Sequence, residues 1–171
     1  MSSQDSKMDL SEIQIRFANT DDIELFMRAR DEEHSDAYTE FIRRLTRFEV
    51  VLAFLCNEPV GLISYTYKEF SDQKLVPTID DIFVIADFKL TDVGERMLEF
   101  LEQHLRQAGH TVVLGIAHDE PRLEEWFIRL GFGCILRVDT FPDDMGPMDP
   151  EAMMEIVNAG SGIACFLRYL D

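Results

Sequence analysis

Two adjacent carboxylates, Asp80 and Asp81, stand in a stretch whose residues predict a β-strand over 77–86. Side chains alternate between the two faces of a strand, so Asp80 is expected on the face of Ile82 and Val84, and Asp81 on the other face. A carboxylate so held can accept a proton from a reacting group, and an adjacent pair attracts a cation. Both acids can equally be solvated charges near the start of a strand.

The residues after this strand predict a turn and then a helix from about Thr91 to Gly109. The first N–H groups of a helix have no partner within it and are suited to binding phosphate. Lys89 supplies a cation before this helix, and Gly94 allows close approach to its backbone. Asp92 has the opposite effect, because its carboxylate either repels a phosphate or takes the same N–H groups as a helix cap.

The remaining pattern indicates which elements hold these residues. Runs of strands on either side of a strand–helix–strand unit predict a mixed α/β sheet of about six to seven strands, flanked by about four helices. Residues 1–11 are expected to form a flexible tail, and residues 12–171 a single domain. The strands are predicted at 13–17, 48–55, 60–67, 77–86, 111–117, 133–138 and 162–170, and the helices from 20, at 38–45, 91–108, 121–130 and, shorter, 150–158.

The composition limits the classes of partner. The 171 residues carry 33 Asp and Glu against 16 Lys and Arg, a net charge of −17. This excludes a general binder of nucleic-acid phosphates and disfavours anionic membranes, while it favours cationic partners such as amines or basic proteins. The acidity can also act only in solubility. The four histidines have no metal-ligand spacing, although His118 follows a strand at an edge where sites form in α/β sheets.

The cysteines and the termini indicate a location. Cys56, Cys134 and Cys165 are odd in number and widely spaced, which favours a reduced, cytoplasmic protein over a disulfide scaffold. The first twelve residues lack the apolar core of a signal peptide, and the longest apolar run, 50–56, is too short to cross a membrane.

Two segments, together with the element order, carry a family resemblance. Val84-Ile85-Ala86-Asp87-Phe88-Lys89-Leu90-Thr91-Asp92-Val93-Gly94 and Leu123-Glu124-Glu125-Trp126-Phe127-Ile128-Arg129-Leu130-Gly131-Phe132 resemble the GCN5-related N-acetyltransferase (GNAT) superfamily over about residues 12–169. The resemblance implies transfer of an acyl group from acetyl-coenzyme A to an amine. It implies that Asp80, better placed than Asp81, is the general base. It implies that the coenzyme is bound by Val84, Ile85, Ala86, Lys89, Leu90, Thr91, Asp92, Val93, Gly94 and Glu95.

Three positions depart from the family pattern. The cofactor turn of the family reads Arg or Gln, two residues, Gly, one residue, then Gly or Ala, and Asp92 stands at the first Gly. Glu120 replaces an Asn that is frequent before the later helix. Phe127 replaces a Tyr that can protonate the leaving thiolate, so water, Tyr65 or Tyr67 would have to supply that proton.

Two functions therefore remain open. The first is an acyl-coenzyme A-dependent N-acyltransferase, in particular an N-acetyltransferase, acting on a small or protein-borne amine. The second is an acetyltransferase-fold protein without catalysis, which binds a basic protein or competes with nucleic acid for a basic groove. The apolar strand at 162–170 leaves an oligomer open as well.

Overall fold

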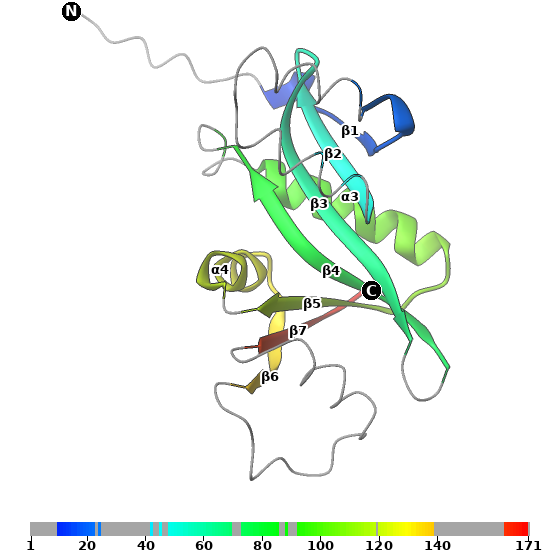
Figure 1. Ribbon diagram of the computed structural model, residues 1–171, viewed down its shortest axis with the longest axis vertical. Helices are drawn as coiled ribbons and strands as arrows, with labels where there is room; N and C mark the ends of the chain where they lie inside the picture. Colours follow the sequence, from blue (N-terminus) through cyan, green and yellow to red (C-terminus); the bar gives the residue numbers. More distant parts are fainter. Residues whose placement is uncertain are drawn as a thin grey trace, which may run out of the picture.

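A seven-stranded mixed sheet forms the centre of the protein, in the order β1-β2-β3-β4-β5-β7-β6 (Figure 1). The computed structural model describes residues 10–22, 24, 42, 45, 48–69, 73–85, 88, 92–118, 120–138 and 163–170. β4 and β5 are parallel, and the other neighbouring strands are antiparallel. The strands are β1 Gln14–Phe17, β2 Glu49–Leu55, β3 Glu58–Glu69, β4 Leu75–Val84, β5 Val112–His118, β6 Gly133–Val138 and β7 Ile163–Tyr169. The predicted mixed sheet is confirmed.

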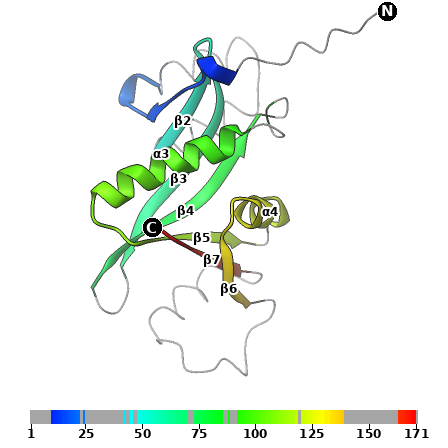
Figure 2. The same ribbon diagram turned by 180° about the vertical axis from the view of Figure 1, so that it is seen from behind.

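Two α-helices complete the described part of the fold, with a short 3-10 helix, η1, at Leu10–Glu12. Figure 2 shows α3, Val93–Gln107, lying across β2, β3 and β4, and α4, Pro121–Arg129, beside β5. Their apolar faces meet the sheet in one continuous core. Residues 20–22, 24, 42 and 45 are helical, while the rest of the helices predicted from 20 and at 38–45, and the helix predicted at 150–158, lie outside the described residues.

The hairpin between β2 and β3 turns at Cys56 and Asn57, whose φ angles are +51° and +69°. The strands predicted at 48–55 and 60–67 leave residues 56–59 for the turn, but Glu58 and Pro59 already belong to β3. Two consecutive residues with positive φ match the right-handed twist of the flanking strands, which explains why the turn is this tight.

The connection from β1 to the helical residues at 20–24 is held by a reciprocal cap. Asn19 Oδ1 accepts the N–H groups of Asp21 and Asp22 at 3.0 and 3.2 Å, and the Asp22 carboxylate accepts the N–H of Asn19 at 2.7 Å. Arg16 donates two further hydrogen bonds to Asp22, at 2.8 and 2.6 Å. Burial alone would raise the pKa of Asp22, but the hydrogen bonds from Arg16 and Asn19 hold it below its ordinary value.

We predict that Asp22→Asn lowers the free energy of unfolding by about 1–2 kcal/mol at pH 7, because Asp22 is buried and its charge is paired. A lowered folded-state pKa gives stability that is present above the unfolded carboxyl pKa, about 3.9, and is lost as pH falls through the folded value. Urea unfolding between pH 7 and pH 3 should therefore show the difference from wild type shrinking. Asp21→Asn, at an exposed neighbour, is the matched control. A difference that stays constant with pH would contradict the prediction.

Candidate functional site

The site is built where β4 and β5 separate. The two strands pair only at Thr78–Leu114 and Ile79–Gly115, and beyond these positions β4 pairs with β3 alone. We call this point the β4–β5 fork. Figure 1 shows the two arrows diverging toward their carboxyl ends, with α4 beside the tip of β5. Among the described residues, no strand pairs with the outer backbone edge of β4 after Ile79.

A β-bulge in β4 lies at the fork. Tyr65 on β3 is opposite Ile79, whereas the preceding Ser64 is opposite Asp81, so Asp80 is the extra residue. The bulge interrupts the alternation on which the sequence prediction depended. Asp80 thus begins the part of β4 that has left β5.

The bulge turns both acids to the same face of the sheet. Ile82 and Val84 belong to the core beneath α3, as does Ile79, three residues before Ile82. The hydroxyl of Thr66, which follows the core residue Tyr65 on β3, donates to Asp80 Oδ2 at 3.4 Å. Asp80 therefore does not share a face with Ile82 and Val84, and that expectation from strand periodicity is wrong.

Asp81 is opposite Ser64, whose neighbours on β3, Ile63 and Tyr65, belong to the core beneath α3. Since directly opposed residues of an antiparallel pair share a face, Asp81 also lies on the face away from α3. The two neighbouring carboxylates differ in exposure, because Asp80 is half-buried and Asp81 is buried. They therefore lie side by side at the fork in different environments.

Arg122, in the first turn of α4, binds the outer edge of β4. It donates to the Ile82 carbonyl at 2.8 Å, to Asp81 Oδ1 at 2.9 Å and to Glu120 Oε1 at 3.0 Å. Burial alone would lower the pKa of Arg122, but Asp81 and Glu120 raise it above its ordinary value. The guanidinium therefore stays charged and supplies the donor that a strand neighbour would give to Ile82.

Arg122 was missed in the sequence reasoning, although a signal for it exists. A cation in the first turn of a helix opposes the helix dipole, so its presence there calls for an anionic partner. Glu120, two residues earlier, is one such partner, and its side chain makes no capping hydrogen bond to α4. Asp81 is the other, and no sequence spacing connects the two residues.

The residues expected to bind coenzyme A fall into three groups. Ile82 directs its carbonyl to the outer edge of β4, so Val84, two residues on, directs its N–H and C=O the same way. The N–H of Ile85 instead donates to Val60 O at 2.9 Å, on the β3 side. Ala86, Lys89, Leu90 and Thr91 lie outside the described residues.

Asp92 occupies the N-cap position of α3, with an ordinary φ of −83°. Its carbonyl accepts the N–H of Arg96 at 2.9 Å, but its side chain makes no capping hydrogen bond. Of the two sequence interpretations, the side-chain cap is therefore not observed. Asp92 and Glu95 are both exposed, so they place negative charge at the start of the helix.

Val93 and Gly94 are both buried in the first turn of α3, and Gly94 gives space to Trp126 of α4. A Cβ built on Gly94 would lie 2.4 Å from Trp126 Cζ3, closer than real atoms approach. The sequence interpretation assigned this space to a phosphate, whereas in the structure an indole ring fills it. The close contact packs the start of α3 against the middle of α4.

The aromatic candidates for a proton donor lie elsewhere. Phe127 is fully buried, and its ring lies 5.1 Å from those of Phe132 and Phe166. Tyr65 and Tyr67 are opposite Ile79 and Pro77, at or before the last residue paired with β5. Burial raises the pKa of Tyr65, which disfavours its use as an acid. His118 ends β5 and is exposed.

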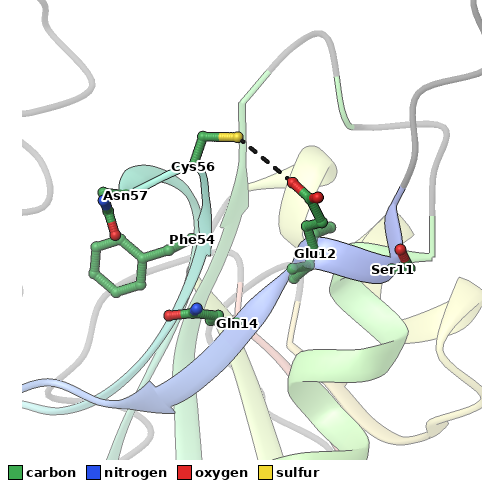
Figure 3. A pocket seen from close by; sticks show the side chains of 7 residues that line it. Ser11, Glu12, Gln14, Phe54, Cys56 and Asn57 are labelled. Carbon is green, nitrogen blue, oxygen red and sulfur yellow. Dashed lines mark hydrogen bonds between the residues drawn. The ribbon is translucent and has the colours of Figure 1, made fainter.

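A separate pocket of about 400 Å³ lies beside the β2–β3 hairpin (Figure 3). Figure 3 shows the Cys56 thiol directed at the Glu12 carboxylate, 3.9 Å away. The described lining of this pocket contains no residue predicted to act in catalysis or to bind the coenzyme.

Among the described residues, no helix is long and apolar enough to span a membrane. In the same part of the chain, no group of three or more His, Cys, Asp or Glu side chains is arranged to hold a metal ion.

We predict that Gly94→Ala lowers the free energy of unfolding by about 1–3 kcal/mol, because the new methyl group displaces Trp126. Gly133→Ala is the matched control, since the nearest atom to its added Cβ is a carbonyl oxygen 3.9 Å away. Replacing Trp126 with Leu in the Gly94→Ala background should recover part of the loss. Chemical denaturation of the four proteins measures this, and equal losses for the two glycine variants would contradict it.

Comparisons with known proteins agree with this geometry. The family model described as the acetyltransferase (GNAT) family matches residues 15–132. A search of curated proteins finds no match. A GNAT-family protein from Desulfovibrio desulfuricans has a similar structure at 14% identity, with a TM-score of 0.62, over 93% of this chain and 99% of that one.

Two further structures were solved with ligands. YncA from Salmonella typhimurium, with its cofactor acetyl-coenzyme A, is 15% identical over 94% of this chain and 95% of its own, with a TM-score of 0.57. Arabidopsis thaliana Naa50, in complex with the bisubstrate analogue CoA-Ac-MVNAL, is 10% identical over 92% and 98%, with a TM-score of 0.56. At these identities the structures establish the fold, and the family model, which matches more than half of the chain, establishes the family. This chain belongs to the GNAT acetyltransferase family.

Proposed function

We propose that this protein transfers an acetyl group from acetyl-coenzyme A to a cationic amine. The observation that carries the proposal is the β4–β5 fork, where the outer edge of β4 continues past its last strand neighbour beside the start of α3. An extended ligand arm can pair with such an edge as an added strand would. The YncA and Naa50 ligands support coenzyme A as the donor.

The backbone groups at the fork and at the start of α3 favour binding of coenzyme A, whereas the nearby carboxylates oppose it. Val84 directs its N–H and C=O to the fork, and the Asp92 side chain does not occupy the first N–H groups of α3. The N–H groups of residues 90–95, with Lys89, would hold the pyrophosphate. The exposed carboxylates of Asp92 and Glu95 oppose it.

The chain's own acids suit an amine acceptor. Bound acetyl-coenzyme A would supply an activated acyl thioester. Asp80, half-buried at the fork, takes the proton that an ammonium must lose before its nitrogen can react. Asp81 is adjacent, but Arg122 balances its charge, so the attraction for a cation depends on Asp80. The Val84 N–H is directed to the fork, where it can polarise a carbonyl. The odd number and wide spacing of Cys56, Cys134 and Cys165 suit a reducing, cytoplasmic setting.

A second candidate is a protein of this fold that binds a basic partner without catalysis. The exposed acids at the start of α3 and the replacement of a tyrosine by the buried Phe127 favour it. Both candidates bind a cationic partner through acidic side chains, so binding of the coenzyme is the observation that separates them.

We expect calorimetry to find micromolar binding of acetyl-coenzyme A, and ligand at a hundred times its Kd to stabilise the protein by about 2.7 kcal/mol. Coenzyme A release should then be measured with spermidine and with a lysine-containing peptide as acceptors. The absence of any thermal shift at millimolar acetyl-coenzyme A would overturn the enzyme proposal in favour of the binding protein.

Asp92→Asn should raise the affinity for coenzyme A about fivefold to tenfold, since it removes one solvent-screened like charge near the pyrophosphate. Asp92→Gly should match it, because the φ of −83° needs no glycine. Asp21→Asn, near the end of β1, is the charge-matched control. An unchanged affinity in both Asp92 variants would mean that this carboxylate points away from the phosphates.

A further inference from the structure

The outer edge of β4 is already occupied at Ile82. Arg122 Nη1 donates a hydrogen bond to the Ile82 carbonyl at 2.8 Å. Arg122 Nη2 donates to Asp81 Oδ1 at 2.9 Å and to Glu120 Oε1 at 3.0 Å. Val84, two residues further along β4, directs its N–H and C=O to the same edge. A ligand that pairs with Val84 as a strand would therefore meet the guanidinium at its next pairing position.

The packing around Arg122 holds the guanidinium in this place. The Asp81 side chain is only 4% exposed, so moving the guanidinium away would leave a buried carboxylate without this ion pair. The helix that carries Arg122 is fixed as well, because Trp126 and Phe127 of α4 fill the space left by glycines on α3 and β5. The guanidinium is thus a fixed obstacle on the edge of β4.

The proposed function sets the direction in which the donor would run along this edge. The first turn of α3, which would hold the pyrophosphate, follows β4 in the chain, so the arm of coenzyme A would run from the carboxyl end of β4 back toward the fork. Its thioester carbonyl would meet the Val84 N–H, and its acyl chain would continue toward Ile82. Two residues of a strand span about 6.6 Å, so only a short acyl chain fits before the guanidinium.

We propose that Arg122 is a specificity-determining residue, which limits the donor to short acyl chains such as acetyl by closing the outer edge of β4 at Ile82. This inference rests on the proposed function. A longer aliphatic chain would have to displace the guanidinium or take water from it, and both are unfavourable. Asp81 and Glu120 already balance the positive charge, so an acyl chain that ends in a carboxylate gains little from Arg122.

The test is calorimetric binding of coenzyme A and of its acetyl, butyryl, succinyl and hexanoyl thioesters to the whole protein, without an acceptor. Acetyl-coenzyme A should bind about tenfold more tightly than hexanoyl-coenzyme A, because the longer chain meets the guanidinium. An open apolar edge would give the opposite order, since each buried methylene group strengthens binding about fourfold. Succinyl-coenzyme A should bind no more tightly than butyryl-coenzyme A, which has the same number of acyl carbons.

Variants at Arg122 should change the ratio of the two affinities. Arg122→Ala should abolish the preference for acetyl, so that hexanoyl-coenzyme A binds at least as tightly. Arg122→Lys keeps the charge but not the planar group that reaches both Ile82 and Asp81, so its ratio should lie between those of the wild type and Arg122→Ala. Arg129→Ala, at an exposed arginine on the same helix, is the matched control and should keep the wild-type ratio. A residue that merely supported the fold would weaken all the ligands alike.

A double variant keeps the test decisive if Arg122→Ala does not fold. Combining Asp81→Asn with Arg122→Ala removes the buried carboxylate together with its guanidinium, so the ion pair is not broken on one side only. This protein should show the same loss of preference for acetyl as Arg122→Ala. The order of affinities in the wild-type protein needs no variant at all.

The failures are distinguishable. If wild-type protein binds acetyl-coenzyme A, equal or tighter binding of hexanoyl-coenzyme A overturns the role of Arg122 and leaves the proposed function intact, as does a wild-type affinity ratio in the Arg122 variants. Tighter binding of succinyl-coenzyme A than of butyryl-coenzyme A also overturns it, because Arg122 would then bind a carboxylate instead of excluding the chain. If wild-type protein binds neither coenzyme A nor any of its thioesters, the proposed function itself fails and the inference fails with it.

Discussion

The parallel pair of β4 and β5 is the constraint on which the site depends. The two strands pair at only two positions and then separate, so the outer edge of β4 has backbone polar groups that no strand in the described part of the chain satisfies. The protein satisfies one of them with a side chain, because Arg122 donates to the Ile82 carbonyl. Two residues further on, Val84 directs its groups the same way. The fork thus creates an edge on which a ligand can take the place of a strand, and Arg122 marks where that edge begins.

Close packing keeps the fork in shape. Two glycines, Gly94 on α3 and Gly115 on β5, leave space for the rings of Trp126 and Phe127 on α4, and an added Cβ at either would lie 2.4 Å from an aromatic carbon. Consecutive residues of α4 therefore fix it to a helix and to a strand at once. The C-terminal end of α4 is held by Arg168 of β7, which donates to the Leu130 carbonyl and to the buried Glu102 of α3. Because α4 is held at Trp126 and Phe127 and at its C-terminal end, Arg122 projects from a helix that is fixed to the sheet and to α3.

The sheet was predictable because its strands are apolar runs separated by turn residues, and the family segments lie on the elements expected for them. The details at the site were not. Asp80 and Asp81 fit a regular strand in sequence, and only the register with Ser64 and Tyr65 reveals the bulge. Gly94 fitted a phosphate turn, but its partner, Trp126, is distant in sequence. Such features depend on which residues meet across the fold, and local periodicity carries no information about that.

The acidity can now be assigned to separate places. At the fork, the buried Asp81 is balanced by Arg122, and the half-buried Asp80 faces the same side of the sheet. At the start of α3, Asp92 and Glu95 are both exposed, and the Asp92 side chain makes no capping hydrogen bond to the helix. The first arrangement favours a cationic acceptor, and the second weakens the hold on a phosphate-bearing donor. Because solvent screens exposed charges more than buried ones, the penalty at α3 is the smaller effect. The described residues therefore keep the backbone groups that would bind a donor, while the exposed charges would lower the affinity for it.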